Sequence, residues 1–148
     1  MDNLEELYAR LAYETRLYKN QLMLLQREIE KITLTTIDLG NATHTVESIH
    51  AGDAFVPIGG GSFVKGAVAS DRVLLGVGGG YLMEVNKDVA VAKLKQRSST
   101  TREAINRLTQ EFTKISAKLD ASNRQLREVE RQVLINRKTE ETAKQDYL

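Results

Sequence analysis

Mostly apolar residues recur at steps of three and four along both ends of the chain, the spacing that places side chains on one stripe of a coiled-coil helix. The steps alternate except at Leu7, Leu11 and Thr15, where two steps of four follow each other as a stutter that locally unwinds a coiled coil. The first stripe consists of Leu4, Leu7, Leu11, Thr15, Tyr18, Leu22, Leu25, Ile29, Ile32, Thr36 and Leu39. The second consists of Ile105, Leu108, Phe112, Ile115, Leu119, Ser122, Leu126, Val129 and Val133, and it fades beyond that point. The pattern predicts two long coiled-coil helices, over residues 1–48 and 88–148.

The two stripes match in length, so they can pair within one chain as an antiparallel coiled coil. Residue numbers of facing positions would then add up to about 138, which puts Leu4 near Val133 and Leu39 near Ser98. Residues beyond about Arg137 have no partner and are expected to form a frayed tail. The alternative is a helical bundle around a globular core, but about 50 residues of helix reach about 75 Å, which is too long for a compact domain of this mass.

The only proline and all ten glycines lie between Gly40 and Gly80. Two similar segments, Val56–Lys65 and Leu75–Glu84, each carry three consecutive glycines between short apolar runs. Glycine supplies the positive φ that tight turns need, so we predict two consecutive β-hairpins over residues 53–86. Such a strip has little core and open edges, which predicts pairing with other chains in an obligate oligomer. The fold class is therefore α+β.

Composition narrows the function. The 148 residues carry a net charge of only +1, which argues against dedicated nucleic-acid binding. There is no cysteine for a disulfide, a thiol nucleophile or a cysteine zinc site. No apolar run approaches the ~18 residues of a membrane span. The acidic, amphipathic beginning of the sequence does not resemble a secretory signal, so we expect a cytoplasmic protein.

Candidate chemistry is sparse. The glycine triplets could cradle phosphates, but neither fits a P-loop or a dinucleotide-binding motif. His44 and His50 are six residues apart in a polar stretch, which favours surface histidines over a metal site. No nucleophile–base pair and no pair of carboxylates stands out. We therefore expect neither an enzyme nor a cofactor.

The central stretch Phe55–Lys65, followed by Arg72–Tyr81 and Glu84, resembles the alpha-class subunit of archaeal prefoldin. The resemblance implies a hexamer of two alpha and four beta subunits whose hairpins join in a β-barrel between subunits. It implies a cytosolic, ATP-independent holdase that captures unfolded polypeptides at coiled-coil tips and delivers them to a group II chaperonin. The expected assembly residues are Val56, Ile58, Phe63, Val64, Val73, Leu75, Val77, Leu82 and Val85.

Capture of unfolded chains requires mobile apolar surface, and helix ends lack half of their hydrogen bonds. The expected client-binding residues lie at the two chain ends: Leu4, Leu7, Tyr8, Leu11, Leu134, Ile135, Tyr147 and Leu148. For the three leucines Leu4, Leu7 and Leu11, closing the seam and contacting clients both stay open. A structural coiled-coil scaffold or tether is the alternative function, although a tether does not need two hairpins at its bend.

Overall fold

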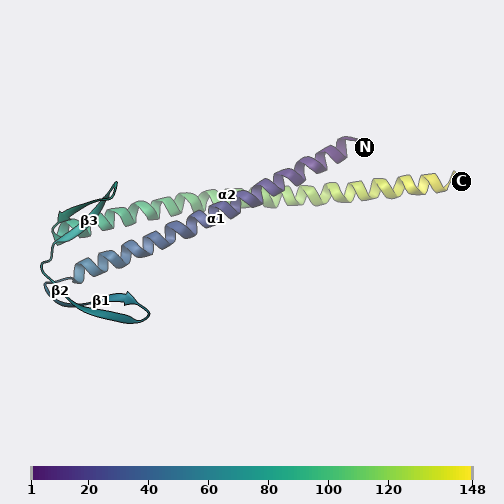
Figure 1. The fold of residues 1–148 in the computed structure, drawn as a ribbon. Coiled ribbons are helices and arrows are strands. Elements are labelled where there is room, and N and C mark those ends of the chain that lie inside the picture. The colour runs from purple at the N-terminus through teal and green to yellow at the C-terminus, as the bar shows by residue number, and fades with distance from the viewer. Residues whose placement is uncertain (1, 148) are drawn as a thin grey trace. The chain divides into compact units, whose positions relative to one another are not determined.

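The computed structural model describes residues 2–147 as two long helices joined by four strands (Figure 1). The elements, in order, are α1 (Asp2–Ser48), β1 (Gly52–Gly59), β2 (Ser62–Val68), β3 (Val73–Gly78), β4 (Tyr81–Val85) and α2 (Lys87–Gln145). This order confirms the predicted α+β fold. The chain divides into two compact units, one formed by residues up to Glu30 with those from Asn106 onwards, the other by Lys31–Ile105.

The apolar stripes form the seam between the helices in each unit. Every predicted stripe position is buried or half-buried, whereas most residues between them are exposed. In the first unit the Thr15 hydroxyl lies 2.9 Å from that of Ser122. In the second, the Thr36 hydroxyl donates to that of Thr101 at 2.7 Å. The residue numbers add up to 137 in both pairs, which confirms the antiparallel pairing and its predicted register.

The start of α2 is capped by Asn86, whose side-chain oxygen accepts a hydrogen bond from the Val89 amide at 2.9 Å. At its other end α2 stays helical to Gln145. The prediction of a frayed backbone beyond about Arg137 was therefore wrong. Residues 134–147 contain no glycine or proline, and most of them are good helix formers. The side chains of residues 138–147, the part that was predicted to lack a partner, are exposed throughout.

The two hairpins form separate two-stranded sheets. Strand β1 pairs with β2, and β3 pairs with β4, both antiparallel. The turns are made by the two glycine triplets, in which all six residues have positive φ, from 58° at Gly60 to 100° at Gly78. This conformation is strained for residues with a Cβ atom, so the triplets serve the turns as predicted.

The second hairpin packs against the helices of its own unit. The core there is formed by Val46 of α1, Leu75 and Val85 of the hairpin, and Ala90 and Leu94 of α2. Polar contacts add to it: the Arg97 guanidinium donates to the Gly76 carbonyl, and Lys95 pairs with Glu47 at 3.2 Å. The Lys87 ammonium donates to the Ile49 carbonyl at 3.2 Å. The β3–β4 hairpin is thus an integral part of the core of this unit.

Candidate functional site

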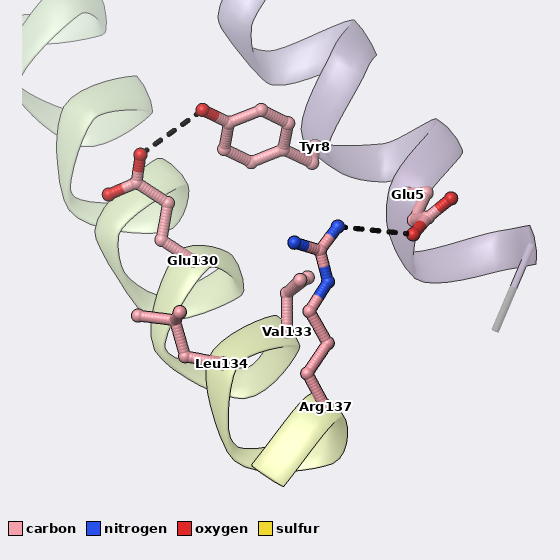
Figure 2. A pocket seen from close by; sticks show the side chains of 6 residues that line it. All are labelled: Glu5, Tyr8, Glu130, Val133, Leu134 and Arg137. Atoms are coloured by element: carbon pink, nitrogen blue, oxygen red, sulfur yellow. Dashed lines mark hydrogen bonds and ion pairs between the residues drawn. The ribbon is translucent and has the colours of Figure 1, made fainter. Parts of the chain in front are cut away.

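A hollow of about 600 Å³ lies between the beginning of α1 and the last part of α2 (Figure 2). We call it the terminal groove, and it is lined by Glu5, Tyr8, Glu130, Val133, Leu134 and Arg137. Its apolar lining consists of Val133 and Leu134 of α2 and the ring of Tyr8 of α1. A smaller hollow of about 170 Å³ shares Glu5, Val133 and Arg137 with it and adds Leu4, Asn136 and Glu140.

Two polar contacts cross the terminal groove from one helix to the other. The Tyr8 hydroxyl donates a hydrogen bond to Glu130 Oε1 at 3.1 Å, and Arg137 Nη2 lies 3.7 Å from Glu5 Oε1 (Figure 2). The hydrogen bond to Glu130, its negative charge and partial burial together raise the pKa of Tyr8 above its ordinary value. Tyr8 is therefore a neutral hydrogen-bond donor at physiological pH.

Tyr8 and Leu134 are the two predicted client-binding residues that line the terminal groove. Leu134 is 59% exposed, its neighbour Ile135 is 55% exposed, and Tyr147 is almost fully exposed. Leu4 and Leu7 are half-buried at the seam, and Leu4 lines the smaller hollow. Leu148 lies outside the described residues.

Leu11 requires a correction. It is only 4% exposed and sits in the seam next to the buried Thr15. A client therefore has no access to its side chain in the paired helices. Of the two roles left open for Leu11, the structure supports closure of the seam.

Sequence reasoning missed the groove's charged residues, Glu5, Glu130 and Arg137, and treated Val133 only as a seam residue. The contact between Tyr8 and Glu130 could have been predicted, because their residue numbers add up to 138, the value expected for facing positions of the two helices. What this relation could not show is that the two residues line a hollow together with Leu134.

The first hairpin presents apolar residues on both of its faces. Directly paired residues of an antiparallel ladder share a face, so Val56 and Val64 lie on one side, and Pro57 and Phe63 on the other. All four side chains are exposed, as is Ile58. A two-stranded sheet with two uncovered apolar faces is not stable alone in water, which agrees with the predicted role of β1–β2 in assembly.

In the second hairpin, two of the residues predicted to contact other subunits lie in the core of the chain itself. Leu75 and Val85 are buried in the chain's own core, and Val73 packs against that core. A side chain already covered by its own helices has little surface left for another chain. Val77 and Leu82 stay exposed and available. Leu74, Tyr81 and Met83 are also exposed on this hairpin, although they were not among the predicted assembly residues.

The comparison with known proteins agrees with this architecture. A family model for prefoldin subunits matches residues 18–132. The chain belongs to the prefoldin family. The prefoldin subunit alpha of Pyrococcus horikoshii is 27% identical over 127 residues, covering 82% of this chain and 86% of the relative. The prefoldin subunit alpha of Methanobrevibacter smithii is 26% identical over 116 residues, covering 76% of this chain and 80% of the relative.

A solved prefoldin structure shares the fold. A chain from the cryo-EM structure of filamentous PFD from Methanocaldococcus jannaschii superimposes with a TM-score of 0.61 at 22% identity, covering 72% of this chain and 92% of that one. The two helices with two small hairpins are thus a prefoldin arrangement, and the resemblance to the alpha class is confirmed. Prefoldin family members are chaperone subunits rather than enzymes.

Within residues 2–147, no helix combines the length and apolar character needed to cross a bilayer. In the same range, no three histidine, aspartate or glutamate side chains are grouped so that they could hold a metal ion.

Proposed function

We propose that this prefoldin subunit is part of a cytoplasmic, ATP-independent holdase that binds unfolded polypeptides and delivers them to a group II chaperonin. Within it, residues 1–48 and 88–148 are the arms of a single subunit, and residues 53–86 join it to its partners. The partners are beta-class subunits, in a hexamer of two alpha and four beta chains, and no nucleic acid or membrane takes part.

The observation that carries this proposal is the exposed apolar surface at the chain ends. Leu134, Ile135 and Tyr147 are all more than half exposed, and Leu134 lines the terminal groove. Burying one such side chain contributes at most about 1.5–3 kcal/mol. One chain therefore binds a client weakly, and several chains held in one assembly bind it well through avidity. This suits a chaperone that must later release its client.

The β1–β2 hairpin supports the assembly part of the proposal. Its two apolar faces need cover that no helix in the described part of the chain provides. Strands of neighbouring subunits would supply that cover and pair its open edges in a shared β-barrel. The assembly residues proposed for this contact are Val56, Ile58, Phe63, Val64, Val77 and Leu82, with Val73 at its margin.

Mixing the purified chain with an archaeal beta-class prefoldin subunit tests the assembly. Native mass spectrometry should then show one stable six-chain complex. A polymer of this chain in place of the six-chain complex would contradict the proposed hexamer. A complex that assembles but fails to suppress aggregation of any denatured client would support the scaffold alternative.

A further inference from the structure

We propose that the terminal groove selects unfolded segments in which apolar residues stand next to lysine or arginine. This inference rests on the proposed function, because it specifies which segments of a client the chain ends prefer. It depends on three features of the groove: its apolar lining, its surplus of carboxylates and the exposed ring of Tyr8.

The charges around the groove are unbalanced. The two hollows together are lined by three carboxylates, those of Glu5, Glu130 and Glu140, and by one guanidinium, that of Arg137. Arg137 is already paired with Glu5. Neither Glu130 nor Glu140 forms an ion pair with a cation among residues 2–147. Two carboxylates at the rim are thus available to a cation brought by a client.

The carboxylate of Glu130 stands where such a cation would also meet apolar surface. Its Oε1 atom accepts the Tyr8 hydroxyl, which holds the ring beside the carboxylate, with Leu134 one turn further along α2 (Figure 2). A lysine or arginine stem can lie along Leu134 and the ring while its charged end reaches the carboxylate. Aromatic rings attract cations as well. An acidic client residue would meet repulsion from the same carboxylate.

The net charge of the whole chain is +1, so general attraction between protein and peptide cannot favour cationic peptides. A preference for them must come from local charge. The terminal groove is one place where an apolar hollow and carboxylates without an ion pair coincide. An ion pair between a client's lysine or arginine and a carboxylate of the groove would be exposed to solvent. We therefore expect cationic segments to bind only about three- to fivefold more tightly than neutral ones.

Fluorescence anisotropy with three labelled peptides tests the inference on the full-length chain. The peptides share one apolar core and are flanked by lysine, by glutamine or by glutamate. We expect the lysine-flanked peptide to bind about three- to fivefold more tightly than the glutamine-flanked one, and the glutamate-flanked peptide to bind least well. The differences should shrink at about 1 M salt, where charges are screened within a few ångströms.

The double variant Glu130→Gln with Glu140→Gln should abolish the preference, so that the three peptides bind with similar affinities. A matched control changes Glu103 and Glu141 to glutamine. Within residues 2–147 these carboxylates, like the two that are tested, form no ion pair, and they lie on the same helix outside both hollows. The control should keep the preference. Equal affinities for all three peptides, or a loss of preference in the control as well, would overturn the inference while capture at the chain ends stands. If no peptide binds at all, the proposed capture itself fails.

Discussion

The hydroxyl groups of Thr15 and Ser122 lie 2.9 Å apart, and both side chains are buried in a largely apolar seam. Each is the hydrogen-bond partner of the other across the two helices. A shift of one helix by a single turn would leave both hydroxyls buried without this partner, which costs roughly 1–3 kcal/mol per group. The pair therefore helps to fix the register of the coiled coil, as buried polar residues do in other coiled coils.

A double-mutant cycle at this pair tests the assignment. Ser122→Ala alone should lower the free energy of unfolding by about 1–3 kcal/mol, because the Thr15 hydroxyl stays buried without its partner. The double variant Ser122→Ala with Thr15→Val should lower the free energy of unfolding by clearly less than the sum of the losses in the two single variants. Urea denaturation followed by circular dichroism measures each step. Strictly additive losses would show that the hydroxyls are not coupled.

Disulfide formation tests the antiparallel pairing within one chain. The natural sequence has no cysteine, so an engineered pair is free of competing thiols. Leu25 and Phe112 are facing seam positions, since their numbers add up to 137 like those of the two hydroxyl pairs. Cysteines at these two positions should crosslink within one chain under mild oxidation, as judged by non-reducing electrophoresis. Crosslinks found only between chains would contradict the hairpin topology.

Neighbouring leucines in β3 should respond in opposite ways. Leu75 is 5% exposed and Leu74 is 65% exposed. Leu75→Ala leaves a cavity in the core and should lower stability by about 2–5 kcal/mol. Leu74→Ala should change the stability of the isolated chain by no more than about 0.5 kcal/mol. Thermal denaturation of the two variants distinguishes them, and similar losses in both would mean that β3–β4 is not docked as described.

The ionisation of Tyr8 should depend on Glu130. Since the raised pKa of Tyr8 reflects stabilisation of the neutral phenol, the contact is present below the ordinary value of 10.0 and is lost as the pH rises through the higher pKa of the folded state. Ultraviolet titration of the wild type, with that of Tyr8→Phe subtracted, isolates this group from the other four tyrosines. Glu130→Gln should bring the pKa of Tyr8 down, and an unchanged pKa would exclude the contact in solution.

The seam up to Leu39 of α1 could be predicted because its period of three and four is local and repeats over many turns, whereas the burial of Thr43 and Val46 beyond it was not predicted. The hairpin turns could be predicted for a similar reason, since each glycine triplet marks a change of direction. The burial of Leu75 could not be predicted, because alternation along β3 distinguishes two faces without showing which face meets the chain's own helices. The terminal groove was missed because it depends on how Tyr8, Glu130 and Arg137 fill the space between facing helices, and periodicity carries no such information.

The aggregation assay on a paired variant tests the central claim most directly. Leu134→Ser with Ile135→Ser removes exposed apolar surface from the end of α2 without touching the seam. Leu34→Ser with Ile37→Ser is the matched control, because both side chains are similarly exposed, on α1 in the other unit. Light scattering of a dilution-denatured client is followed with each complex at equal concentration. We expect graded loss of protection in the first variant, with unchanged complex mass, and full protection in the control. Full protection by the first variant against every client tested would contradict capture at the chain ends.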